Sequence, residues 1–127
     1  MQFAVPRRGL PGAASFRKWC AGFPDVTIRI VGRREGLFLN RTFRGKGKPT
    51  NVLTFDTGDI VLCHPVVARE ARKQGKSLAA HYAHLVVHGA LHLRGYDHMT
   101  KREASRMEKE EIRRLSRLGF RNPYELE

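Results

Sequence analysis

Residues Ser77–His98 read SLAAHYAHLVVHGALHLRGYDH, and this stretch decides the fold. From Ser77 to Leu93, apolar residues occupy nearly every side of a helix instead of a single stripe. A helix that is apolar all round is covered by other elements on all sides. The pattern therefore predicts a buried helix over Ser77–Leu93 at the centre of the molecule, separated from the preceding segment by a break at Gly75.

The chain before this helix predicts short strands. The run VTIRIVG alternates apolar and polar residues and contains β-branched side chains, which favours a half-buried strand. The runs TNVLTFD and DIVLC predict a hairpin with a tight turn at Asp56-Thr57-Gly58. The expected strands are Gln2–Val5, Val26–Gly32, Asn51–Phe55 and Asp59–Cys63.

Further helices are expected on both sides of the hairpin. The segment Glu35–Phe43 suits a helix or a strand, and we favour a helix because Gly45 and Gly47 then terminate it. The last helix opens with the capping box Thr100-x-x-Glu103. The remaining boundaries are Ala13–Ala21, Val66–Gln74 and the end of the last helix at Gly119.

These elements predict an α+β fold and a single domain over residues 1–127. We expect a small mixed β-sheet of about four strands, packed against several helices. The helix that carries the histidines is expected to be buried against this sheet.

Three histidines predict a metal site at the end of the central helix. At about 100° per residue, His88 and His92 lie about 40° apart around the helix and one turn apart along it, so both can reach one ion. His98 would be out of reach if the helix continued, and Gly95 stands where a left-handed turn is needed. Three neutral imidazoles leave the fourth position of a tetrahedral Zn²⁺ open, as in catalytic zinc sites.

Other interpretations of the histidines stay open. His84 and His88 also form an i, i+4 pair, but no glycine and third histidine follow them at matching offsets. We therefore expect His84 to be a core histidine or to support a ligand. His64, beside Pro65, is expected to be a structural residue or a polar loop residue. The alternative without a metal is that the three histidines are hydrogen-bonded residues of a buried helix.

The spacing H-x-x-x-H-x-x-G-x-x-H is shared with the metzincin proteases, which have a glutamate directly after the first histidine as general base. Here that position is Gly89. A peptidase of that type would lack its base, so the spacing does not predict proteolysis. A phosphodiester is the better substrate, because a metal can activate water and stabilise charge on the phosphate, helped by arginine.

The charge of the chain predicts a polyanionic partner. The 127 residues carry a formal net charge of +12, with a pI near 10.7. Residues 1–50 hold eleven Lys and Arg against two acids, a net of +9, whereas residues 51–100 hold five against four, a net of +1. Nucleic acid is the first candidate and an anionic membrane surface the second.

Two features of the sequence predict a cytoplasmic protein. No apolar run is long enough to span a bilayer, and the N-terminal residues do not form a signal sequence.

Cys20 and Cys63 are far apart and lack C-x-x-C spacing, so we expect reduced thiols instead of a disulfide or a metal pair.

Four blocks of the sequence resemble the YbeY endoribonucleases. They are LNRTFRGKGKPTNVLTFD (Leu39–Asp56), GDIVLC (Gly58–Cys63), HLVVHGALHLRGYDH (His84–His98) and MEKEEIRRLSRLGFRNPY (Met107–Tyr124). The resemblance implies a metal-dependent endoribonuclease of ribosomal RNA maturation, acting at the 3′ end of the small-subunit RNA and in ribosome quality control. It also implies that Arg34–Phe43 is a helix, and that RNA, ribosomal RNA and ribosomal particles are the partners, with no membrane.

The resemblance further assigns roles to residues. It implies one Zn²⁺ per chain on His88, His92 and His98, and a functional arginine at Arg44. Two positions depart from the family pattern: Gly47 replaces an acid that is common there, and Arg94 replaces a frequent leucine and adds a candidate RNA contact.

The expected reaction is metal-assisted cleavage of single-stranded RNA. Arg44 would hold the scissile phosphate and offset its charge. Asp97, next to a ligand, is expected to support the site and is assigned no catalytic step, and no residue is assigned as the general base. Contacts to the RNA backbone are expected from Arg41, Lys46, Lys48 and Arg94. Two alternatives remain: a zinc-stabilised, ribosome-associated RNA-binding factor without catalysis, and a metal-dependent hydrolase of peptides.

Overall fold

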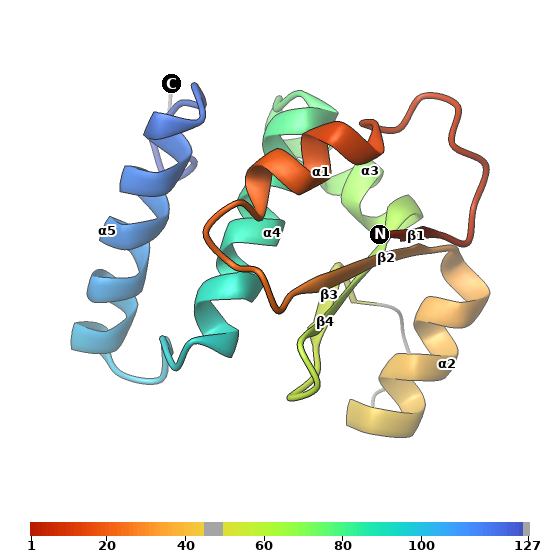
Figure 1. Ribbon diagram of the computed structural model, residues 1–127, viewed down its shortest axis with the longest axis horizontal. Helices are drawn as coiled ribbons and strands as arrows, with labels where there is room; N and C mark the ends of the chain where they lie inside the picture. Colours follow the sequence, from red (N-terminus) through yellow and green to blue (C-terminus); the bar gives the residue numbers. More distant parts are fainter. Residues whose placement is uncertain (45–49, 126–127) are drawn as a thin grey trace.

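A mixed β-sheet lies at the centre of the molecule, with helices on both of its faces (Figure 1). The structure is a computed structural model that describes residues 1–44 and 50–125. Within these residues the elements are β1 (Gln2–Phe3), α1 (Ala13–Trp19), β2 (Thr27–Val31), α2 (Arg33–Arg44), β3 (Val52–Thr54), β4 (Asp59–Cys63), α3 (His64–Gln74), α4 (Leu78–Leu93) and α5 (Lys101–Arg117). The predicted α+β fold is confirmed.

The strands lie in the order β1-β2-β4-β3. Strands β1, β2 and β4 run parallel, with Thr27 opposite Asp59 in the β2–β4 pair. Strand β3 runs antiparallel to β4, with Val52 opposite Leu62, so the predicted hairpin is confirmed. All residues of β4 after Asp59 are buried, as expected for an inner strand that is covered on both faces.

Two groups of buried side chains flank the sheet. The larger group lies towards α1 and α4, where the ring centroids of Phe16 and Trp19 are 5.0 Å apart and those of Phe16 and Tyr82 are 5.4 Å apart. The smaller group lies on the opposite face, which α2 covers; its members are Val31, Leu53, Val61, Cys63 and Val66. Helix α5 packs on the outer side of α4, away from the sheet (Figure 1). Helix α4 is therefore enclosed, as its composition predicted.

Helix α4 approaches the sheet closely at Gly89. A Cβ atom at this position would lie 3.2 Å from Thr54 Cγ2 and 3.2 Å from Ile60 Cδ1, both in the β3–β4 hairpin. Ile60 is fully buried, so it has little freedom to move away. The glycine that stands where a metzincin has its glutamate thus faces the sheet, and position 89 has no room for a catalytic carboxylate.

The start of helix α3 differs from the boundary expected from the sequence. This helix begins at His64, two residues before the expected Val66, because Pro65 fits the first turn, where its missing N–H costs no hydrogen bond. The Nδ1 atom of His64 lies 2.7 Å from the hydroxyl of Tyr82, and the two rings are stacked. Of the two roles expected for His64, the structural one is therefore confirmed.

Two other expectations are borne out. The ambiguous segment after β2 is helical, as α2. Cys20 and Cys63 are both free thiols; burial raises the pKa of Cys20 to about 11 and also raises the pKa of Cys63. No helix in the described ranges is long and apolar enough to cross a bilayer.

Replacing Gly89 with glutamate should lower the free energy of unfolding by more than about 2 kcal/mol. The new side chain would press on Ile60 and Thr54, and its carboxylate would be buried or the helix displaced. Urea unfolding of the metal-free protein measures the loss. The matched control is Ser105→Glu at an exposed position of α5, which should change the value by less than about 0.5 kcal/mol. Equal stabilities of the two variants would contradict the close packing.

Candidate metal centre

His88 and His92 lie one turn apart in the last part of helix α4. They lie about 100° and 60° from Gly89 around the helix, so their rings project beside the sheet and not into it. His88 is partly buried, with 28% of its side chain exposed, and His92 is exposed. The pair therefore stands at an edge of the core that solvent can reach.

Helix α4 ends in a Schellman turn. The backbone N–H of Gly95 donates to the carbonyl of His92 at 3.0 Å, and the N–H of Tyr96 donates to the carbonyl of Leu91 at 3.1 Å. The φ angle of Gly95 is 98°, which side chains other than glycine rarely adopt. The turn expected at Gly95 is confirmed, and it sends the chain back along the end of α4.

His98 returns to the two helical histidines. Its ring centroid lies 5.5 Å from that of His88 and 6.4 Å from that of His92. The His98 side chain is 57% exposed. Asp97 Oδ1 accepts a hydrogen bond from the backbone N–H of His98 at 2.7 Å, so this carboxylate orders the loop that carries the third imidazole. The structure thus brings the three predicted histidines together at an open site.

The residues suit zinc by type and by approximate position. Imidazole nitrogens bind Zn²⁺ at about 2.0–2.1 Å, so two rings that share a tetrahedral ion have centroids about 5 Å apart. The separation of 5.5 Å between His88 and His98 is close to this value. His98 is farther from His92, and within residues 1–44 and 50–125 no group of three or more His, Cys, Asp or Glu side chains is already gathered tightly enough to hold an ion. Their assignment as ligands stays a prediction.

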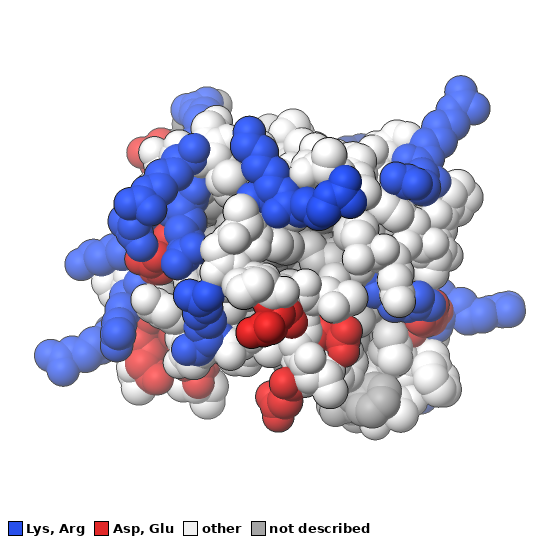
Figure 2. All heavy atoms as spheres, viewed as in Figure 1, with Lys and Arg blue, Asp and Glu red and all other residues white. Residues whose placement is uncertain are grey.

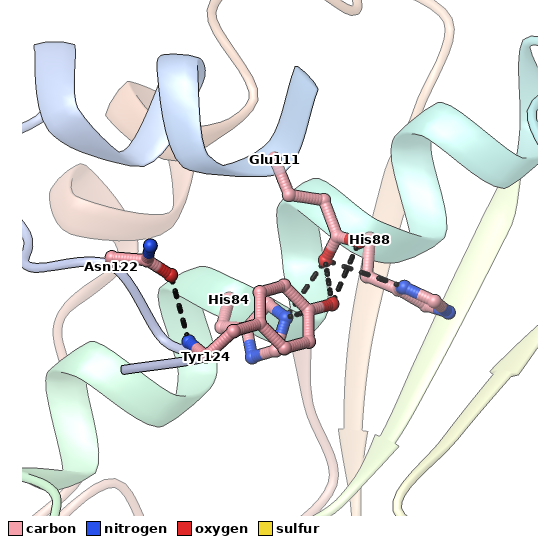
Figure 3. A network of polar contacts seen from close by, with 5 residues as sticks. All are labelled: His84, His88, Glu111, Asn122 and Tyr124. Atoms are coloured by element: carbon pink, nitrogen blue, oxygen red, sulfur yellow. Dashed lines mark hydrogen bonds and ion pairs between the residues drawn. The ribbon is translucent and has the colours of Figure 1, made fainter. Parts of the chain in front are cut away.

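A buried glutamate that the sequence analysis did not single out lies behind His88 (Figure 3). Glu111 of α5 is only 1% exposed. Its Oε2 atom lies 2.7 Å from His84 Nε2 and 3.4 Å from His88 Nδ1. The hydroxyl of Tyr124 donates to its Oε1 atom at 2.9 Å. His84 therefore contacts the same buried carboxylate as His88, and neither of its two expected roles, core histidine or support of a ligand, is decided by this contact.

The position of Glu111 did leave a signal in the sequence. Met107, Glu111 and Leu115 follow one another at a spacing of four on α5, and all three are buried. The glutamate thus interrupts an apolar stripe. Its surroundings, EKEEIRR over residues 108–114, have the composition of a solvent-exposed face, which conceals it.

The network keeps Glu111 ionised. Burial by itself would raise the pKa of this carboxyl, but its hydrogen bond with His84 and its contact with His88 outweigh burial and lower the pKa to about 2. Burial, together with the charge and hydrogen bond of Glu111, raises the pKa of Tyr124. The phenol therefore keeps its proton and acts as the donor.

Comparison with known proteins decides the family. The family model described as Endoribonuclease YbeY matches residues 12–119. The chain belongs to the YbeY endoribonuclease family. Endoribonuclease YbeY of Nitrosomonas eutropha is 50% identical over 135 residues, with 98% of this chain and 96% of that protein covered. Endoribonuclease YbeY of Xanthomonas axonopodis pv. citri is 48% identical over 146 residues, with 98% and 91% covered.

A solved structure shares the fold of this YbeY protein. The solution structure of TM1509 from Thermotoga maritima matches with a TM-score of 0.55 and 22% identity, and the match covers 98% of both chains. The resemblance seen in the four sequence blocks is thus confirmed by the family match. Membership of the YbeY family supports an endoribonuclease role, with RNA as the substrate.

The basic residues that the sequence assigned to RNA are described only in part. Arg41 is exposed on α2. Arg44 is the last residue of this helix, and its side chain, like Lys46 and Lys48, lies outside the described part of the chain. Figure 2 shows Lys and Arg side chains gathered over α5 and α1 on one face, with acidic side chains at its lower middle. On this face, positive side chains therefore come from α5 as well as from α1, which belongs to the basic residues 1–50.

Arg94 is already engaged within the YbeY fold. Its Nη2 atom donates to the carbonyl of Gly22 at 2.5 Å, and its guanidinium lies 4.7 Å from the ring centroid of Phe23. The guanidinium of Arg114 on α5 lies 4.6 Å from the same ring centroid. Arg94 thus ties the end of α4 to the segment before β2, and its expected contact with RNA stays a prediction.

Replacing Gly95 with alanine should lower the free energy of unfolding by about 1–2 kcal/mol, because a Cβ atom is strained in the left-handed region. Gly12→Ala is the matched control, since Gly12 has a φ of −77° and nothing within 4 Å of an added Cβ atom. Urea unfolding of both variants without metal gives the comparison. A loss in Gly95→Ala no larger than in Gly12→Ala would show that the turn tolerates a side chain.

Proposed function

We propose that this YbeY family member is a zinc-dependent endoribonuclease that cuts single-stranded RNA. The observation that supports the proposal most directly is the gathering of His88, His92 and His98 at the open end of α4, in a chain of an endoribonuclease family. We further propose that it acts in the cytoplasm at the 3′ end of small-subunit ribosomal RNA and in ribosome quality control. The net charge of +12 suits such a polyanionic particle.

In the proposed site His88, His92 and His98 hold one Zn²⁺ per chain. A zinc ion on three imidazoles supplies a Lewis acid for the phosphate and lowers the pKa of a bound water. The exposure of His92 and His98 leaves the site open to a long substrate. Asp97 keeps the loop of the third histidine in place through the His98 backbone N–H.

Arg44 is proposed to hold the scissile phosphate. A guanidinium donates to two phosphate oxygens at once and offsets the charge that develops as the bond breaks. Arg44 ends α2, and Lys46 and Lys48 follow it in the sequence, so one short segment would supply both the clamp and further backbone contacts.

Helix α2 offers a surface for the bases of a single strand. Phe38 is 62% exposed, and Arg34 and Arg41 lie one turn away on either side, both exposed. The nearby Glu35 is paired with Arg29 at 2.9 Å. An exposed ring between two cations is suited to stack a base while the arginines contact its phosphates. We therefore add Phe38 to the proposed RNA interface.

Peptide hydrolysis is the weaker alternative. Its general base would have to replace the glutamate that metzincins carry at position 89. That position packs against Ile60 and Thr54, so no side chain there can serve the site. The remaining alternative is RNA binding without cleavage. It differs from the proposal only in that the bound RNA is not cut.

Two variants should separate metal binding from chemistry. His92→Ala should lose bound zinc and RNA cleavage together, because an open site of three ligands cannot spare one. Arg44→Ala should keep its zinc and lose cleavage by on the order of a hundredfold, comparable to the loss of one preorganised charge-stabilising donor. Zinc content by atomic emission and cleavage of labelled single-stranded RNA are the measurements, with Arg117→Ala on α5 as the charge control.

The same assay distinguishes the alternatives. Unchanged zinc content in His92→Ala would refute the ligand set, and cleavage that survives Arg44→Ala would refute the phosphate clamp. Tight binding without cleavage by the wild-type protein would favour the RNA-binding factor. Cleavage of casein but not of RNA would favour the peptidase.

Phe38→Ala should weaken binding of single-stranded RNA by about 5- to 100-fold, the effect of losing one stacked base. Phe38→Tyr should bind like the wild type, because the ring still stacks. Fluorescence anisotropy with a labelled oligonucleotide at constant salt concentration gives the affinities. Equal RNA affinities of Phe38→Ala and the wild type would show that Phe38 does not contact the RNA.

A further inference from the structure

We propose that Glu111 is a positioning residue of the metal centre: it holds His88 with a proton on Nδ1 and directs Nε2 outward to the ion, and Tyr124 holds Glu111 in turn. Zinc affinity would then depend on helix α5 and on the segment that follows it. The inference rests on the proposed function for the metal itself, but the state of the His88 ring can be measured without metal or RNA.

The burial of Glu111 calls for such a role. An ionised carboxylate loses its hydration when it is 1% exposed. An apolar residue would continue the stripe from Met107 to Leu115 without this cost. The carboxylate is therefore matched to the polar groups that face it and contributes little to packing as such.

The groups that face Glu111 assign the protons. A carboxylate can only accept hydrogen bonds, so each close nitrogen must carry a hydrogen. The closest is His84 Nε2 at 2.7 Å from Oε2. His84 Nδ1 is buried and has no partner among the side chains that the structure describes, so the neutral ring carries its proton on Nε2.

The same argument applies to His88 at longer range. Its Nδ1 atom lies 3.4 Å from Glu111 Oε2, and Figure 3 shows the other ring nitrogen pointing away from the carboxylate. A neutral imidazole with its proton on Nδ1 has its lone pair on Nε2. Metal-bound histidines commonly donate their second N–H to a carboxylate, which sets the tautomer and makes the ligand more basic.

Tyr124 completes the arrangement from the segment after α5. Its hydroxyl lies 2.9 Å from Oε1 and 3.1 Å from Oε2 of Glu111, and its ring stands edge-on to His84 with centroids 5.3 Å apart. The side chain of Asn122 accepts a hydrogen bond from the Tyr124 backbone N–H at 2.8 Å. The turn after α5 thus places the phenol next to the carboxylate of Glu111 and next to the ring of His84.

The direct test is the tautomer of His88 in the metal-free protein above the pH at which histidines are charged. Long-range ¹H–¹⁵N NMR spectra distinguish Nδ1–H from Nε2–H. The wild type should show Nδ1–H at His88 and Nε2–H at His84. An Nε2–H tautomer at His88 in the wild type would overturn the proposal, whatever the protein does with zinc or RNA.

Glu111→Gln tests the consequence for the metal. It keeps the shape of the side chain and removes its charge, so the zinc dissociation constant, measured by competition with a chromogenic chelator, should rise by about 10- to 100-fold. Glu110→Gln is the matched control, because Glu110 is the neighbouring residue and pairs with Arg113 and Arg114. Tyr124→Phe should give a smaller loss in the same direction, since it removes one donor to the carboxylate.

The outcomes separate this proposal from the proposed function. Wild-type zinc affinity in folded Glu111→Gln would overturn the positioning role even if RNA cleavage is confirmed. Should Glu111→Gln fail to fold, the decision passes to Tyr124→Phe and to the wild-type tautomers. A protein that binds no zinc but shows Nδ1–H at His88 would refute the proposed function and leave the carboxylate–histidine contact standing.

Discussion

The close contact between helix α4 and the sheet at Gly89 sets the positions of His84, His88 and His92 on that helix. Without a side chain there, the helix backbone rests against Ile60 and Thr54, which fixes its rotation. Residues four apart then drift about 40° around the helix. His84 consequently faces α5 with 13% of its side chain exposed, His88 follows with 28%, and His92 is exposed. The contact at Gly89 thus gives these three histidines increasing exposure along the helix, from mostly buried His84 to exposed His92.

Features that depend on nearby residues could be predicted from the sequence. The apolar helix, the hairpin around Asp56–Gly58 and the left-handed turn at Gly95 each follow from patterns a few residues long. The capping box at Thr100 is present with both of its hydrogen bonds, each 3.1 Å long. The gathering of His98 with the helical histidines belongs to this class, because a single turn produces it.

Features that join distant segments could not be predicted in this way. The contacts of Glu111 come from α4 and from the residues after α5, and no local pattern pairs it with His84 or Tyr124. The sequence shows that Gly89 stands where a metzincin has its glutamate, but not that α4 approaches the β3–β4 hairpin closely at this residue. The sequence predicts an RNA contact for Arg94, which stays a prediction, and gives no sign that its guanidinium also contacts Gly22 and Phe23 across the fold.

The three histidines of the candidate site fall within eleven residues of sequence, His88–His98. Closing so short a loop costs little entropy, so these imidazoles stay near one another even in the unfolded chain. A ligand stabilises a fold only through the difference between its affinities for the folded and unfolded states. Histidines this close in sequence discriminate weakly between the two states. The carboxylate of Glu111 and the phenol of Tyr124 come together with them only on folding. These two groups would therefore raise the metal affinity of the folded chain above that of the unfolded chain, and metal binding would stabilise the fold through them.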